Sequence, residues 1–186
     1  MLDRTLTLKA AAYTTLSRNS YFFVFLAANS TQNLGNVPKT RIQGFEVEAN
    51  FRPTSDIQLN AAAGYTFSEI KEFPDAAAIG NEAPLISRYT FNLGAQYTPQ
   101  LTDTLDGLFR VDYRRTGKTW WEPFNTTVRA PVDLVDARLG VSSDSWTMAA
   151  FASNLFNEKY NAEFSPGGFV FKARPRIYGL EASYKF

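Results

Sequence analysis

The chain has 186 residues and a net charge of +1, with 19 Lys and Arg side chains against 18 Asp and Glu. This length fits one domain of ordinary size, and the balanced charge lacks the basic footprint of a nucleic-acid-binding protein. Cys and His are absent, which excludes thiol catalysis, disulfides, Cys/His zinc sites and Ser-His-Asp triads. We therefore expect neither catalysis nor a cofactor. The longest apolar run, Tyr21 to Ala28, is too short for a membrane-spanning helix, which needs about 18 residues or more.

Apolar and polar residues alternate with period two along most of the chain, which is typical of β-strands with two unlike faces. In the stretch 87–98, for example, Leu93 and Ala95 fall on one face, whereas Asn92 and Gln96 fall on the other. The same pattern predicts about eight strands and no helix. In chain order these strands lie near residues 5–12, 44–52, 57–68, 87–98, 109–114, 135–141, 146–155 and 178–186.

One segment does not alternate. Tyr21–Ala28 is apolar on both faces and follows the polar stretch Ser17–Ser20. It fits either the upper part of one very long first strand or a separate strand, which would make the strand count odd. We interpret it as the upper part of the first strand.

The expected connections between the strands are alternately short and long. Short turns are expected near residues 52–56, 99–104 and 142–145, and longer loops near 29–38, 71–85, 118–131 and 157–172. In an up-and-down meander this alternation gathers all long loops at one end, as in outer-membrane barrels. The sequence therefore predicts an all-β fold of antiparallel, up-and-down transmembrane β-barrel strands.

Three features favour lipid, rather than a dry core, as the environment of the apolar face. Aromatic residues stand at the ends of apolar stripes, as Phe45 and Phe51 do around Val47, and such aromatic girdles mark membrane interfaces. The opposite faces carry charges, such as Asp112 and Arg138, that suit a wet lumen. The strands are also long enough for a tilted bilayer crossing of about 9–11 residues. A soluble ligand-binding barrel alternates in the same way and stays open as an alternative.

Two motifs lie close to the C-terminus: an N-L-F-N-E-K-Y stretch over residues 154–160, and a P-R-x-Y-G stretch that leads to a terminal aromatic residue. Together they closely resemble the end of TonB-dependent receptors. The residues that carry the resemblance are Asn154, Leu155, Phe156, Tyr160, Pro175, Arg176, Tyr178, Gly179, Tyr184 and Phe186. The stretch Gly44–Glu48 also resembles a barrel strand of that family, and the resemblance covers essentially the whole chain.

The resemblance implies a receptor with a plug and a barrel of about 22 strands, of which residues 1–186 are the C-terminal part without the plug. Such a receptor imports a scarce ligand, for example a ferric siderophore, cobalamin or a carbohydrate, across the bacterial outer membrane. The expected partners are outer-membrane lipid, the ligand, the TonB complex acting through the plug, and the barrel assembly machinery, which reads the terminal Phe186. A complete eight-stranded barrel with a structural or adhesion role stays open, because eight strands can close around their side chains.

Aromatic residues in the long loops are the candidate ligand contacts. The loop 118–131 carries Trp120, Trp121, Phe124 and Arg129, and the loop 157–172 carries Phe169. Exposed rings of this kind stack on a ligand, although packing within the loops or anchoring at the membrane interface is the alternative reading.

Glu46 and Glu48 are the one carboxylate pair that invites a catalytic reading. They lie on the same face of one predicted strand, about 6.5–7 Å apart, which is a separation that an acid/base pair would need. We expect them instead to be lumen charges that are balanced by Arg110, Arg114 or Arg138 on other strands.

Overall fold

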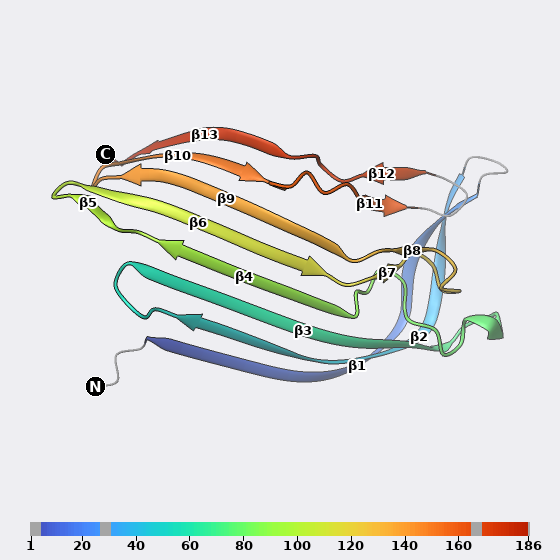
Figure 1. The fold of residues 1–186 in the computed structure, drawn as a ribbon. Coiled ribbons are helices and arrows are strands. Elements are labelled where there is room, and N and C mark those ends of the chain that lie inside the picture. The colour runs from blue at the N-terminus through green and yellow to red at the C-terminus, as the bar shows by residue number, and fades with distance from the viewer. Residues whose placement is uncertain (1–4, 27–30, 165–168, 186) are drawn as a thin grey trace.

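The computed structural model describes residues 5–26, 31–164 and 169–185. One antiparallel sheet of nine strands contains eight in the order β1-β2-β3-β4-β6-β9-β10-β13, and the ninth, β5, lies off this path (Figure 1). The bounds of the eight are β1 Leu6–Leu26, β2 Thr31–Phe51, β3 Ile57–Glu72, β4 Tyr89–Tyr97, β6 Leu105–Thr116, β9 Val132–Ser142, β10 Trp146–Ser153 and β13 Ile177–Tyr184. The predicted all-β, up-and-down antiparallel fold of about eight strands is confirmed.

Shorter elements lie at the ends of this sheet. β5 (Gln100–Thr102) pairs with β6, while β7 (Thr119–Trp120) with β8 (Val128–Arg129), and β11 (Asn161–Phe164) with β12 (Val170–Lys172), form two separate ribbons in the long loops. A single turn of 3-10 helix, Ala76–Ala78, follows β3. No helix in the described part of the chain is long and apolar enough to cross a membrane.

The long connections and the short turns lie at opposite ends of the sheet. Figure 1 shows the short turns at the end where the chain termini also lie, and the β7–β8 and β11–β12 ribbons at the other. The short turns after β2, after β5 and after β9 fall where the sequence predicts them. We refer to the end with the long connections as the loop end.

The first hairpin is longer than the other strands, and β1 and β2 have 21 residues each. The interpretation of Tyr21–Ala28 as the upper part of the first strand is confirmed as far as Leu26, since Tyr21–Leu26 is continuous with Leu6–Ser20; Ala27 and Ala28 lie outside the described residues. The expected long loop at residues 29–38 is wrong, because residues 31–38 belong to β2. Pro38 lies opposite Asn19, where the β1–β2 ladder skips a pair and Asn19 has a φ of +55°. Proline is accommodated at this position because it lacks the N–H for a ladder bond.

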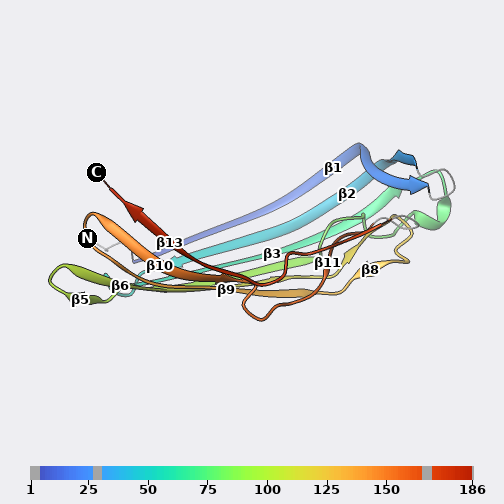
Figure 2. The same cartoon turned by 90° about the horizontal axis from the view of Figure 1, so that it is seen from above.

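The sheet has one apolar face and one charged face, as the period-two alternation predicts. On the apolar face, Leu180 is 86% exposed, and aromatic pairs such as Phe45–Tyr65 and Tyr97–Phe109 stand 5.8 and 6.0 Å apart. Figure 2 shows that the sheet is curved. Its two edges, β1 and β13, do not pair with each other in the described residues.

Candidate functional site

The charged face of the sheet carries ion pairs within a strand, between neighbouring strands and across one intervening strand. Arg110 pairs with Asp112 at 2.6 Å, Arg114 approaches Asp136 at 3.8 Å, Arg138 pairs with Glu181, and Lys9 approaches Glu48 at 3.8 Å. These residues occupy the inward positions of β1, β2, β6, β9 and β13.

The expected partners of the two β2 carboxylates are therefore wrong. Glu48 faces Lys9 because β1 is its direct neighbour, whereas each of the three arginines pairs with an acid on its own or a nearby strand. Glu46 has no ion-pair partner within the described ranges. The arrangement is a wall of charged side chains.

A small hydrophobic core lies at the loop end, outside the main sheet's apolar face. Val37 from β2, Ile70 from β3 and Ala83 from the following loop are at most 4% exposed, and Phe73 and Ile86 pack against them. The loop 73–88 is therefore held down on the extended ends of β2 and β3.

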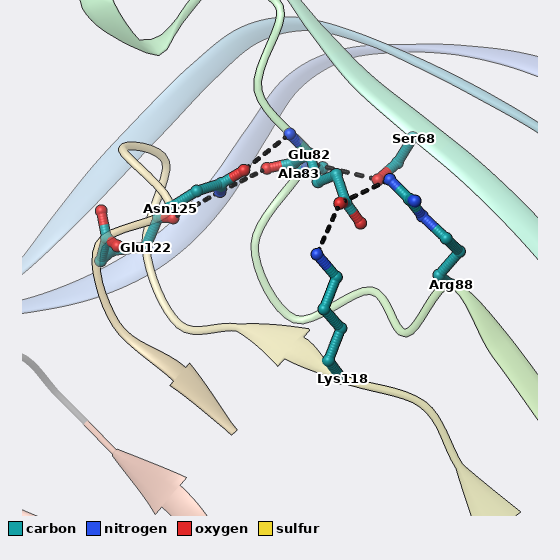
Figure 3. A network of polar contacts seen from close by, with 7 residues as sticks. All are labelled: Ser68, Glu82, Ala83, Arg88, Lys118, Glu122 and Asn125. Carbon is teal, nitrogen blue, oxygen red and sulfur yellow. Dashed lines mark hydrogen bonds and ion pairs between the residues drawn. The ribbon is translucent and has the colours of Figure 1, made fainter. Parts of the chain in front are cut away.

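The Asn125 side chain joins the loops 73–88 and 117–131, because its amide pairs with both backbone groups of Glu82 as a neighbouring strand would (Figure 3). The side-chain amide of Asn125 accepts a hydrogen bond from the Glu82 N–H at 2.9 Å and donates one to the Glu82 carbonyl at 2.9 Å. The Ala83 N–H donates to the Ser68 hydroxyl at 3.1 Å. Asn125 has a φ of +55°, a left-handed conformation in which asparagine is enriched.

We refer to these contacts between the loops 73–88 and 117–131 as the loop cluster. Glu82 is the charged residue at its centre. Its carboxylate accepts a hydrogen bond from Arg88 at 2.6 Å and lies 3.3 Å from the Lys118 ammonium, with only 15% of its side chain exposed (Figure 3). The Lys118 ammonium also lies over the Trp120 ring, 4.8 Å from its centroid. The buried Trp120 Nε1 and Arg88 Nε have no hydrogen-bond partner in the described structure.

The predicted ligand residues differ in how far their side chains are exposed to solvent. Trp121 is 7% exposed, and its ring lies 6.2 Å from the Phe164 ring and 6.0 Å from the Arg129 guanidinium; contact of Trp121 with a ligand stays a prediction. Phe124 is 42% exposed and stands edge-on to Phe73.

Two further candidates take part in contacts within their own loops. The Arg129 guanidinium donates to the Thr119 hydroxyl at 3.0 Å. Phe169 lies 4.9 Å from Phe171, in the loop that carries the β11–β12 ribbon. Trp120, Phe124 and Arg129 thus share one loop, while Phe169 belongs to another, and ligand contact by any of them stays a prediction.

The two C-terminal motifs form one joint, at which β10 ends and β13 begins. The Asn154 side chain donates to the carbonyls of Glu158 and Arg174 at 3.0 and 3.3 Å and accepts from the Glu158 N–H at 2.7 Å. The Arg176 N–H donates to the Asn157 side chain at 3.0 Å. Asn154 and Asn157 both have positive φ, at +52° and +57°. The motifs are separated in sequence because the last long loop lies between them.

The other motif residues complete the joint or lie on the apolar face. The Arg176 guanidinium donates to the Leu155 carbonyl at 3.3 Å, and the Phe151 ring lies over Gly179, where a Cβ atom would approach that ring to 3.0 Å. Tyr178 and Tyr184 are exposed on the apolar face, at 78% and 64%. Phe186 lies outside the described residues.

The family model described as TonB dependent receptor-like, beta-barrel matches residues 1–155. The chain belongs to this family. The resemblance seen in the C-terminal motifs is confirmed by this match, although the matched region ends at the first of them. The chain is thus a member of a family of receptors.

Solved receptor structures share the fold of this barrel chain. The ferric preacinetobactin receptor of Acinetobacter baumannii matches with a TM-score of 0.80 at 20% identity, over 98% of this chain and 27% of that one. The ferric yersiniabactin uptake receptor of Yersinia pestis matches with 0.82 at 19%, over 99% and 28%. The ferric-catecholate import receptor of Escherichia coli K12 in its closed form matches with 0.73 at 24%, over 100% and 26%. The chain thus spans about a quarter of the length of these receptors.

Sequence reasoning missed the residues that hold the loop cluster together. Glu82 and Asn125 belong to no periodic pattern, Ser68 is only one polar residue of the predicted strand 57–68, and the contacts of Asn125 with Glu82 cross 43 residues. One signal was available, since asparagine is favoured where φ is positive, and Asn125, Asn154 and Asn157 all have positive φ.

Proposed function

We propose that this chain is the C-terminal part of the barrel of an outer-membrane TonB-dependent uptake receptor. The observation that carries the proposal is the two-faced open sheet. It has an apolar face with aromatic pairs, a charged face, and two edges, β1 and β13, that pair with no further strand among the described residues. In lipid, each unpaired backbone group costs several kcal/mol, so the edges need partner strands. Further strands of a barrel of about 22 strands would supply them.

The names of solved receptors with the same fold support one class of ligand. Receptors with the same fold are named for ferric preacinetobactin, ferric yersiniabactin and ferric catecholates, which supports a ferric siderophore ahead of cobalamin or a carbohydrate. In the whole receptor, the TonB complex would act through a plug, and this chain would supply lipid-facing wall, part of the lumen and two loops for ligand contact. The assembly machinery would recognise its C-terminal strand.

The proposal is tested with a deletion strain in which the gene containing this chain is removed in frame. We expect energy-dependent uptake of one ferric siderophore from a panel to be lost and then restored by the intact gene, and a protonophore should abolish the restored uptake. Uptake of the whole panel that is unchanged by the deletion would contradict the siderophore assignment.

The competing reading is a complete small barrel of eight strands with a structural or adhesion role. An antibody raised against this chain distinguishes the two readings in outer-membrane extracts. A complete small barrel gives a band near 20.9 kDa. A receptor of the relatives' proportions, in which this chain covers 26–28% of the length, gives a band several times heavier.

A further inference from the structure

A pocket of about 410 Å³ opens on the charged face beside the joint of the two C-terminal motifs. Its wall comes from inward positions of β6, β9, β10 and β13, and its rim comes from the segments that flank the β11–β12 ribbon. The residues that line it and carry its chemistry are Arg114, Leu134, Asp136, Tyr160, Arg174 and Ile177.

The pocket combines two arginine side chains, Arg114 and Arg174, with an apolar floor. Arg114 approaches Asp136 only at 3.8 Å, without a hydrogen bond, and 55% of its side chain is exposed. Arg174 is exposed, and its guanidinium has no ion-pair or hydrogen-bond partner among the residues described. A guanidinium group offers five N–H donors in a fork that matches a carboxylate.

Asp136 carries a single negative charge, so it cannot neutralise both arginines that line the pocket. Its carboxylate accepts a hydrogen bond from the Asn154 N–H at 2.8 Å, so the joint holds it in place at the pocket wall. The pocket therefore has two cations against one anion. Leu134 and Ile177 supply an apolar surface, and Tyr160 adds an aromatic ring. Binding pockets in proteins typically combine an apolar lining with a few convergent polar groups.

We propose that this pocket binds a small organic anion with a flat apolar body, such as an aromatic carboxylate. The carboxylate is held between Arg114 and Arg174, and the ring lies against Leu134 and Ile177. This inference rests on the proposed function, because it places the pocket on the lumen wall of an uptake receptor. It assigns a binding role to residues that lie away from the aromatic loop 118–131.

The test uses the intact receptor that carries this chain, purified in detergent and titrated with para-fluorobenzoate under fluorine NMR. We expect saturable binding of para-fluorobenzoate and none of para-fluorobenzyl alcohol, which has the same ring without the charge. Arg174→Gln is expected to raise the apparent Kd about ten-fold, as expected for the loss of a charged hydrogen bond. Lys159→Gln is the matched control, because Lys159 is an exposed cation on the other side of the β11–β12 ribbon and does not line the pocket.

Three results would overturn the inference: no saturable binding by the wild type, as when another segment of the receptor fills the pocket; equal binding of the neutral alcohol; or equal effects of the two substitutions. Arg114→Gln is a second variant and is expected to weaken binding as well. Heat-modifiable migration on gels shows that each variant is folded. Siderophore uptake is measured separately, so failure of the transport proposal and failure of the pocket are read from different experiments.

Discussion

The membrane-crossing sheet and the loop end differ in where they bury apolar surface. At the loop end, Ile70 is fully buried and Val37, Ala83 and Trp121 are nearly so. In the sheet, Leu93 and Leu180 are 42% and 86% exposed, although they belong to the most regular part of the fold. Ala149 is the one buried hydrophobic residue of the described chain that lies away from the loop end.

The difference fits the proposed place of the chain in an outer membrane, where the two regions meet different solvents. A sheet in a bilayer needs no protein core on its outer face, because acyl chains cover the apolar side chains. Loops that extend into water must bury apolar side chains against each other and satisfy their own backbone groups. The loop cluster does both, with the core around Ile70 and the Asn125–Glu82 hydrogen bonds.

The largest effect is expected for a charge on the outer face. Leu93→Arg should lower the free energy of unfolding in lipid vesicles by about 2–4 kcal/mol, the midplane penalty for a lipid-facing arginine. Ala62→Arg is the control, because Ala62 faces inward opposite Glu48, and it should change stability by less than about 0.5 kcal/mol. Equal losses in a denaturant titration would contradict the assignment of the faces.

A cavity should cost more at the loop end than on the lipid face. Ile70→Ala removes a fully buried side chain and should cost about 2–3 kcal/mol, because the core cannot refill the cavity. Val47→Ala, on the exposed outer face, should cost less, since lipid fills the space. Hydrogen exchange over residues 73–88 reports the local loss, and a similar cost for both variants would remove the distinction between the regions.

The link between the two loops should depend on the Asn125 side chain. Asn125→Gly keeps the positive φ but removes both hydrogen bonds to Glu82, so it should weaken the loop cluster by about 1–2 kcal/mol. Faster proteolysis within residues 73–88 is the expected result. Ala130→Gly, an exposed position in the same loop, controls for added flexibility and should leave the rate unchanged.

The smallest effect is expected from pH. Lys39 donates a 2.8 Å hydrogen bond to Glu72 beyond the aromatic rows, and it lowers the pKa of that carboxyl below its ordinary value of 4.5. The bond therefore stabilises the loop end above that value and is lost as the pH falls through the lowered pKa. The acid-induced increase in hydrogen exchange around Glu72 should be absent in Glu72→Gln, and an identical increase in the variant would contradict this role.

The sequence predicts the sheet well because each strand contains its own signal. Alternation such as Leu93 against Asn92 requires no knowledge of the rest of the fold, and it yields all eight strands of the main sheet. The two strands of the first hairpin were harder to predict at the loop end, because Tyr21–Leu26 lacks alternation and Pro38 normally indicates a loop. Its place in a strand depends on the facing Asn19.

The candidate sites were less predictable, because they depend on which strands and loops become neighbours. The partner of Glu48 is set by the β1–β2 register, which composition alone does not specify. The contact of Asn125 with Glu82 needs two loops to meet. The C-terminal motifs can be recognised in the sequence, but the hydrogen bonds between them are evident only in the structure.

The joint between those motifs also separates the last long loop from the wall of the sheet. Asn154 and Asn157 hold the backbone at Arg174 and Arg176, and the Ala173 N–H donates to the Tyr160 carbonyl at 3.0 Å. The chain between Tyr160 and Ala173 thus leaves and returns through a clamp of fixed width. We expect insertions, deletions or replacements between Tyr160 and Ala173 to leave the position of the final strand unchanged, so that this segment can diversify as a unit.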